Sequence, residues 1–518
     1  MPNDVDANVE ASLRYLASGA GWLFLGIFTS KILAYVYRAF IARTLPVSDY
    51  GIFNLAVMLT TLAATIAALG LTQGLSRYVP YYRAKNDAAS LGNALKFVLI
   101  ITLISSLFIT SIIYLFSEQI SGWFGNGAEL SILIKYLSLH IPFSVLGLNV
   151  FLFCLLYFSK AKLYSLLFNV VLNVVRLGGA VAFVLLGFGI LGVGISYVLS
   201  FVVVGLLAFY FFEFKTFSIF KPHNKEACEF KTRDFLSYSW PLLFVAIIGS
   251  INGWIDSFMI GHLMTVKDVG VYNGALPVSQ LLLVIPSLIA PLFLPLLSGH
   301  LAKNECGEIG KISKRVFKWI FAANFFVFLV MLAFPGALIN FIFGRNYLAG
   351  TQVLSILSFG FLALSLAIPF SQLLELHKKT KLILVNISCI VIINIILNYF
   401  LIPIYGINGA AIATTISNCA LAWLVFLENY FIIKINAFSL INVKIIIAGI
   451  IPFFSLLAIR WLSKQYLPIL IITGLAMFCI YIWIFFKLKL IDATDKKIVR
   501  ALESKGIKIP KIIYSIIK

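Results

Sequence analysis

Charged residues are scarce in this chain of 518 residues. Only 12% of the residues are charged, 61% are hydrophobic, and the mean hydropathy is +1.02. A soluble domain has about 25% charged and about 45–50% apolar residues. The composition therefore excludes a soluble enzyme, a disordered protein and a disulfide scaffold, and it predicts a polytopic membrane protein.

Signals of secretion and of metal binding are missing as well. The six cysteines show no CxxC spacing, and four of them lie inside apolar runs, so we expect free thiols in a reducing compartment. Residues 1–16 carry Asp4, Asp6 and Glu10, whereas a secretory signal begins with basic residues. We therefore expect neither a disulfide framework nor a cleaved leader.

Long hydrophobic runs make up most of the chain. Because about 20 apolar residues cross a bilayer as a helix, these runs predict an all-α protein with about fourteen transmembrane helices. A transmembrane barrel would instead need alternating strands of about ten residues. The predicted spans are 17–42, 52–75, 92–116, 131–158, 165–187, 190–212, 239–262, 272–298, 316–343, 352–375, 382–402, 407–431, 443–462 and 467–487.

Basic residues alternate between the two sides of these spans. One side, which includes both termini and the loop after every even-numbered span, holds 31 of the 40 basic residues, and the other side holds six. The positive-inside rule then places both termini in the cytoplasm of a cell-membrane protein. Since topology explains most of the net charge of +20, no nucleic-acid partner is needed.

The chain contains an internal repeat. The pattern V-x-D-x-G-x-F-N at 47–54 returns as V-x-D-x-G-x-Y-N at 266–273, and Phe124-Gly125 returns as Phe343-Gly344. Each repeat holds six spans, so both halves enter the membrane in the same direction, and transporter sites lie between such halves. The predicted parts are a cytoplasmic N-terminus (1–16), an N-lobe (17–212), a cytoplasmic linker (213–238), a C-lobe (239–431), two further helices (432–487) and a basic cytoplasmic tail (488–518).

The charge alternation assigns three basic residues to neither side, and these three lie inside predicted spans. Lys31 and Arg38 share a helix face with Tyr35, and Arg176 shares a face with Asn173. A charge in hydrocarbon costs about 2.5–3.5 kcal/mol, so such residues usually face a cavity or a partner. One interpretation is a hydrated cationic cavity that binds an anion. The alternatives are snorkelling and internal ion pairs.

Asp256, in span 7, is the acidic counterpart of these residues. The repeat predicts that Asp256 and Arg38 lie at similar depth in opposite halves. An ion pair between Asp256 and a basic residue and a direct contact with substrate are both open. His140, in span 4, is predicted to be a core histidine with its hydrogen bond satisfied.

Span 8 carries several prolines. Interior prolines remove backbone hydrogen bonds and kink a helix, so this span is expected to be bent, either as a gating element or as a static kink. The prolines are Pro277, Pro286, Pro291 and Pro295.

The stretch from Arg38 to Tyr78, R-x-x-I-A-R-T-L-P-V-S-D-Y-G-I-F-N-L-A … L-G-L-T-Q-G-L-S-R-Y-V, closely resembles the opening of prokaryotic polysaccharide-biosynthesis membrane proteins. These are the Wzx-type flippases of the MOP exporter superfamily. The region after Asp256 looks like its counterpart in the second half. Pro46 replaces the glycine usual in the family's L-G pair, which affects only the loop turn.

The resemblance implies a flippase that moves a polyprenyl-(pyro)phosphate-linked oligosaccharide from the cytoplasmic to the outer leaflet by alternating access. Its expected partners are the anionic lipid-linked glycan, membrane lipids and glycan-assembly proteins. We expect a monomer without a cofactor, coupled to Na⁺, H⁺ or the membrane potential. Lys31, Arg38, Arg176, Asp256, Tyr35 and Asn173 are the candidate substrate-binding residues.

Four alternatives differ in class. A MATE-like antiporter of small molecules needs carboxylates in its cavity, whereas three basic residues face one acid here. A membrane enzyme or an ATP-driven pump needs a catalytic constellation or a Gly-rich phosphate loop, and the loops offer neither. A scaffold subunit is opposed only by the charges inside the spans.

Overall fold

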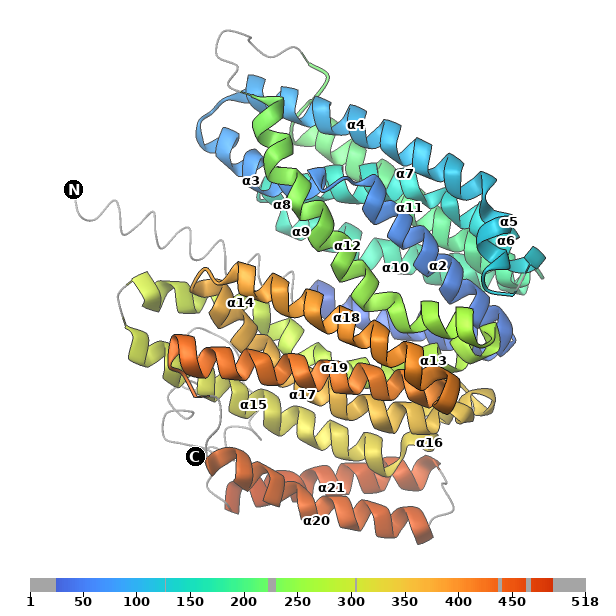
Figure 1. Cartoon of the computed structure of the whole chain (residues 1–518), viewed down its shortest axis with the longest axis vertical. Helices are drawn as coiled ribbons and strands as arrows, with labels where there is room; N and C mark the ends of the chain where they lie inside the picture. The colour runs from blue at the N-terminus through green and yellow to red at the C-terminus, as the bar shows by residue number, and fades with distance from the viewer. Residues whose placement is uncertain are drawn as a thin grey trace. The chain divides into compact units, whose positions relative to one another are not determined.

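The structure, a computed structural model, describes residues 25–125, 127–221, 230–302, 305–436, 440–462 and 467–487. Within these residues the chain forms helices and turns, and no strand occurs (Figure 1). The predicted N-terminus and basic tail, and part of the predicted linker, lie outside them. The prediction of an all-α membrane protein is confirmed.

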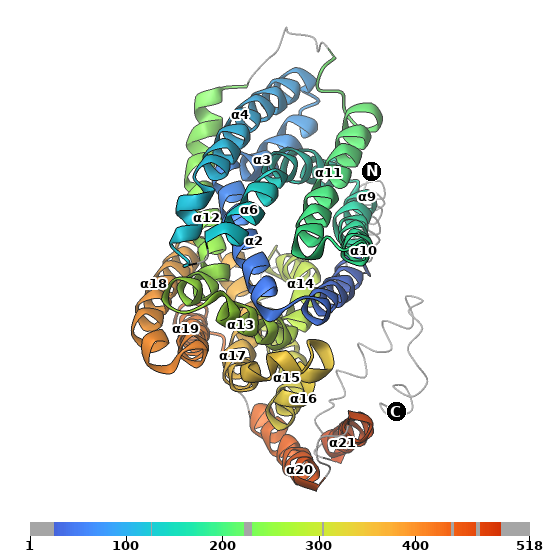
Figure 2. The ribbon, with the colours of Figure 1, turned by 90° about the vertical axis from the view of Figure 1, so that its right-hand side faces the viewer.

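Twelve of the described helices are long and apolar enough to cross a membrane. Their positions follow the first twelve predicted spans, beginning with Leu25–Thr44. The predicted thirteenth and fourteenth spans coincide with α20 (Leu440–Leu462) and α21 (Leu467–Lys487), which lie side by side (Figures 1 and 2). Twelve spans thus meet the criterion of length and composition, against fourteen predicted.

The chain divides into two compact units. Unit 1 comprises residues 1–278, 342–357 and 380–417, and unit 2 comprises the remainder. The division between N-lobe and C-lobe that the repeat predicts stays a prediction. Helical elements that lie wholly in unit 1, besides Leu25–Thr44, are α2 (Val47–Ala67), α3 (Leu71–Ala84), α4 (Ala88–Leu115), α5 (Ser117–Gly122), α6 (Gly127–Ser138), α7 (His140–Pro142), η1 (Phe143–Leu152), α8 (Phe153–Tyr157), α9 (Ala161–Ser165), η2 (Leu166–Val171), α10 (Leu172–Leu185), α11 (Gly189–Lys215), α12 (Thr232–Leu263), η4 (Arg345–Gly350) and α18 (Thr380–Tyr405).

Unit 2 holds a smaller helical bundle. Its core is aromatic: the Phe317 ring packs edge-on against Phe370 and Phe426. The Tyr481 hydroxyl of α21 donates to the Ala322 carbonyl at 3.0 Å. The elements wholly in unit 2 are η3 (Gln280–Leu283), α14 (Val284–Ala302), α15 (Cys306–Ala333), η5 (Asn429–Ile433), α20 and α21. Four helices have residues in both units: α13 (Val266–Ser279), α16 (Pro335–Ile342), α17 (Thr351–Leu376) and α19 (Ile407–Glu428).

Several predicted spans are not regular α-helices. The second span is broken between α2 and α3, where Leu69 and Gly70 have φ angles of 52° and 69°. The eighth is divided by the 3₁₀ turn η3, so the expected irregularity in the proline-rich span is present. The fourth and fifth contain the π-helical segments η1 and η2. Such segments frequently mark functional sites in helices.

The repeated motif has a structural reason within unit 1. A Cβ atom on Gly51 would lie 1.8 Å from the Val266 carbonyl oxygen, and one on Gly270 would lie 2.2 Å from the Val47 carbonyl oxygen. The first turns of α2 and α13 therefore contact each other backbone to backbone and reciprocally. Only glycine leaves room for this approach, which explains why both copies of the motif carry it.

Candidate functional site

A cavity of about 230 Å³ lies inside unit 1 and collects several of the predicted residues. The helix Leu25–Thr44 contributes Arg38, and α10 contributes Arg176 and Asn173. Tyr37 of the same first helix also lines the cavity, and α2, α11 and α12 add aromatic and polar side chains, among them Tyr50, Asn54, Thr61, Tyr197 and Trp254. No carboxylate lines the cavity, so its two guanidinium groups make it cationic.

Arg176 lies against aromatic rings. Its guanidinium carbon is 4.3 Å from the ring centre of Tyr197 and 5.4 Å from that of Phe201. The Nε atom of Arg176 is buried and makes no hydrogen bond with the described residues. Aromatic faces stabilise a cation without neutralising it. Arg176 therefore keeps its charge and part of its hydrogen-bonding capacity for a ligand.

Hydrogen bonds of polar residues near Arg176 hold its helix next to the first described helix. The Asn173 amide donates to the Ser30 hydroxyl at 3.1 Å and to the Asn169 carbonyl at 2.9 Å. Gly26 packs closely on Asn169, because a Cβ atom there would lie 3.0 Å from the Asn169 amide nitrogen. The predicted polar face of span 5 thus packs on span 1 and brings Arg176 and Arg38 to one cavity.

Two predicted residues of span 1 are placed elsewhere. Lys31 is exposed and does not line this cavity. The Tyr35 hydroxyl donates to the Pro277 carbonyl oxygen at 2.5 Å, also within unit 1. His140 is buried, with its Nδ1 atom 2.6 Å from the Leu137 carbonyl oxygen, as expected of a core histidine.

Asp256 belongs to a separate polar cluster in unit 1. Its carboxylate accepts hydrogen bonds from the Tyr272 hydroxyl at 2.7 Å, from the Asn398 amide at 2.8 Å and from the Thr414 hydroxyl. The Asn398 side-chain amide also donates to the side-chain oxygen Oδ1 of Asn394 at 2.9 Å. Within the described residues Asp256 makes no ion pair with Arg38. In this conformation, polar contacts from α13, α18 and α19 therefore take the place of the ion pair considered for Asp256.

The Asp256 cluster holds oxygen atoms of the kind that bind a cation. The side-chain oxygen Oδ1 of Asn398 is buried and makes no hydrogen bond with the described residues. One carboxylate with amide and hydroxyl oxygens is the ligand type that hard cations prefer, and a proton on Asp256 is the other possibility. Among the described residues there is no group of three His, Cys, Asp or Glu side chains of the kind that holds a transition metal.

Sequence reasoning missed much of the cavity wall. Tyr37, Tyr50, Tyr197 and Trp254 line the cavity with the arginines, but aromatic residues make up 15% of the chain and do not single out these four. Asn54 was visible as part of the repeated motif. Its amide donates to the Tyr50 carbonyl at 2.7 Å, as the Asn273 amide does to the Val269 carbonyl at 2.9 Å. The motif therefore preserves a local hydrogen bond in both copies.

Solved structures share this fold. A lipid II flippase, MurJ, in an inward closed conformation aligns with a TM-score of 0.71 at 17% identity, over 90% of this chain and 99% of that chain. An inward-facing multidrug resistance MATE family transporter of the MOP superfamily aligns with a TM-score of 0.62 at 16% identity, over 78% of this chain and 94% of that chain. At these identities the likeness shows the fold.

Sequence relatives and family models complete the comparison. Agl15 of Haloferax volcanii, a probable low-salt glycan biosynthesis flippase, is 27% identical over 77% of this chain and 78% of its own length. The uncharacterized membrane protein MJ1068 of Methanocaldococcus jannaschii is 25% identical over 92% of this chain and 96% of its own. The MatE family model matches residues 241–400. The model described as polysaccharide biosynthesis protein matches residues 16–299, more than half of the chain, so the protein belongs to the polysaccharide biosynthesis protein family.

Proposed function

We propose that the protein is a flippase for a polyprenyl-(pyro)phosphate-linked oligosaccharide used in building cell-surface glycans. The observation that carries this proposal is the pair Arg38 and Arg176 in a cavity without a carboxylate. Uncompensated charge is costly inside a membrane, so such a cavity favours an anionic ligand. Guanidinium groups bind phosphate oxygens with paired hydrogen bonds, which suits the phosphate of a lipid carrier.

The proposed cycle moves substrate from the cytoplasmic to the outer leaflet by alternating access. The phosphate enters the cationic cavity while the polyprenyl tail stays in lipid. Both termini lie in the cytoplasm of this cell-membrane protein, as the distribution of basic residues favours. The protein acts as a monomer and performs no covalent chemistry on the glycan.

The coupling ion that drives this cycle is proposed to bind at Asp256. Its carboxylate has three hydrogen-bond donors, two of them from Asn398 and Thr414, more than 140 residues further along the chain. Na⁺ or H⁺ binding there would exchange these bonds for others and so favour one arrangement of α12, α18 and α19. In this proposal the cationic cavity binds the substrate phosphate, and the Asp256 cluster binds the coupling ion.

A MATE-like antiporter of cations is the alternative. The Asp256 carboxylate is the feature that favours it, because a cationic cargo needs a negative charge. The cationic cavity opposes it, since two guanidinium groups repel such a cargo. The Agl15 relative, a probable glycan flippase, also supports the first proposal.

A transport assay separates the two proposals. The purified protein is reconstituted in vesicles with a fluorescent polyprenyl-pyrophosphate-linked sugar, and an impermeant quencher reports how fast the label changes leaflet. We expect at least a tenfold slower rate for the double variant Arg38→Ala/Arg176→Ala, whereas Arg345→Ala, an exposed arginine, behaves as wild type. Gradient-driven uptake of a cationic dye with no lipid flipping would support the antiporter instead.

A further inference from the structure

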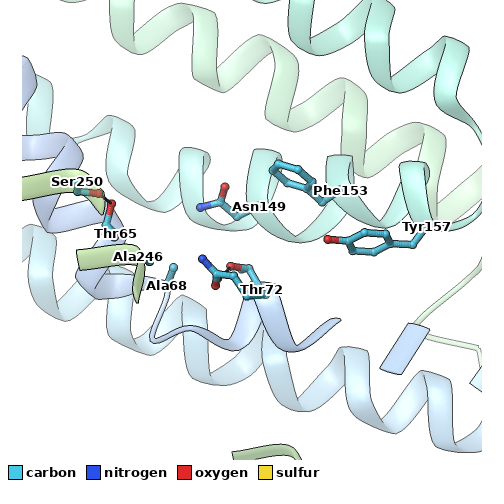
Figure 3. A pocket seen from close by; sticks show the side chains of 9 residues that line it. Thr65, Ala68, Thr72, Asn149, Phe153, Tyr157, Ala246 and Ser250 are labelled. Carbon is cyan, nitrogen blue, oxygen red and sulfur yellow. Dashed lines mark hydrogen bonds between the residues drawn. The ribbon is translucent and has the colours of Figure 1, made fainter. Parts of the chain in front are cut away.

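A second cavity in unit 1 differs in character from the cationic one. Its volume is about 310 Å³, at the lower end of the range of about 300–1,000 Å³ for small-molecule sites. Asn149, Phe153 and Tyr157 project from the η1–α8 segment, and Thr72 faces them from α3 (Figure 3). The lining has amides, hydroxyls and two aromatic rings but no charged side chain.

Two side-chain amides in this cavity have hydrogen-bonding groups available to a ligand. The Asn149 amide makes no hydrogen bond with any described residue. The Gln73 amide accepts one bond from the Thr72 hydroxyl at 2.9 Å, which leaves its NH₂ group free within the described structure. Arg83 does not line the cavity; its guanidinium donates to the backbone carbonyl of Tyr157 at 2.6 Å and lies 4.6 Å from the Phe158 ring centre.

Two irregular backbone segments create the cavity. The break between α2 and α3 places Thr72 and Gln73 on its wall, and the π-helix η1 carries Asn149. At this break, Gly70 packs closely against the backbone of α12. A Cβ atom on Gly70 would lie 2.4 Å from the Ser239 carbonyl oxygen and 2.7 Å from the Leu243 backbone nitrogen. The site is therefore set by tightly packed backbone, as a preformed binding site requires.

The neutral cavity adjoins the cationic one along two helices. On α2, Thr61 lines the cationic cavity and Thr65 lines the neutral one. On α12, Trp254 lines the cationic cavity and Ser250 lines the neutral one. The hydroxyl groups of Thr65 and Ser250 are 3.1 Å apart. Four residues of helix rise about 6 Å, so the two cavities are neighbours along these helices, and one substrate that carries a phosphate beside a sugar can reach both.

We infer that the neutral cavity binds an uncharged sugar residue of the substrate, the one next to the lipid-linked phosphate. This inference rests on the proposed flippase function and assigns a specificity site to it. Amide groups satisfy sugar hydroxyls, and the rings of Phe153 and Tyr157 cover the apolar face of a pyranose. The lack of a charged side chain disfavours an acidic or basic sugar here, because a buried ligand charge would be unpaired.

The test compares two classes of lipid on the full-length protein in detergent micelles. The first class is polyprenyl phosphate carrying glucose, galactose or mannose, and the second is bare polyprenyl phosphate. We expect wild type to bind at least one glycosylated lipid more tightly than the bare lipid. Asn149→Leu and Gln73→Leu each weaken that binding about tenfold, the effect of one lost hydrogen bond to a partner left unpaired, and leave bare-lipid binding unchanged.

Controls make each outcome decisive. Gln119→Leu makes the same chemical change on an exposed helix, and it should bind as wild type does. Gln73 is itself exposed, so its variant remains informative if Asn149→Leu fails to fold. Equal binding of all lipids by wild type, or an equal loss for both classes in the variants, overturns the sugar site while the flippase proposal stands. No binding of any lipid by wild type overturns both.

Discussion

Replacement of Arg176 by Met tests the cationic cavity most directly. Met has a similar length and no charge, and its sulfur packs well against aromatic rings such as Tyr197. The variant loses the hydrogen bonds to phosphate, each worth about 1.5–3 kcal/mol when charged groups take part. The cation–π contact at 4.3 Å exists with and without ligand, so its loss largely cancels in the binding free energy.

One lost bond of about 2 kcal/mol corresponds to about 30-fold weaker binding of polyprenyl phosphate. Thermal stability should change little, since the buried Nε atom that lacks a hydrogen bond is removed together with the charge. Arg176→Lys keeps a point charge without the paired donors, and we expect about tenfold weaker binding. Titration of detergent-solubilised protein with the lipid, together with a melting curve, gives both quantities.

The exposed residue Arg345 provides the matched control as Arg345→Met. Binding of Arg176→Met within twofold of wild type, at an unchanged melting temperature, would refute the phosphate contact. A large fall in melting temperature would instead identify Arg176 as part of the packing around Tyr197.

Three further predictions concern other parts of the molecule. Asp256→Asn keeps the shape and most hydrogen bonds of the cluster but removes its charge, so flipping should lose its dependence on a Na⁺ or H⁺ gradient; a variant that responds to both gradients as wild type does would exclude Asp256 as the coupling site. Gly51→Ala introduces an atom 1.8 Å from the Val266 carbonyl oxygen and should destabilise the protein by about 1–3 kcal/mol, whereas Gly249→Ala, with nothing within 4 Å of the added atom, should be neutral or slightly stabilising in a thermal melt. In a cysteine-free background, cysteines at Asn126 and Asn346 should react with an impermeant thiol reagent outside the cell and one at Lys225 should not; labelling at Lys225 in intact cells would reverse the proposed orientation.

The sequence predicts the helices well and the cavities only partly. Long apolar runs specify spans, and the i, i+3 spacing of Asn173 and Arg176 correctly indicates one shared polar face. The helix break at Leu69 and Gly70 cannot be predicted from the sequence, because the apolar run continues through it. The break packs against the backbone of α12, which is distant in the sequence. Local pattern cannot reveal a packing partner 170 residues away.

The candidate charges illustrate the same limit. Lys31 and Arg38 share a helix face by spacing, yet only Arg38 lines the cavity, because depth along the helix decides which neighbours it meets. Asp256 stands out in the sequence as a charge inside a span, whereas its partners Asn398 and Thr414 are common polar residues on distant helices. Their role becomes visible only when α12, α18 and α19 are placed together.

The reciprocal contact of Gly51 and Gly270 also bears on how the two copies of the repeated motif can diverge. After a duplication, each copy usually accumulates substitutions independently of the other. Here, a side chain at either glycine would collide with the backbone of the other copy, so a change in one half cannot be accommodated by a smaller residue in the other. Selection therefore acts on each glycine separately and equally strongly, and this motif should remain recognisable in both copies long after the surrounding spans have lost their similarity.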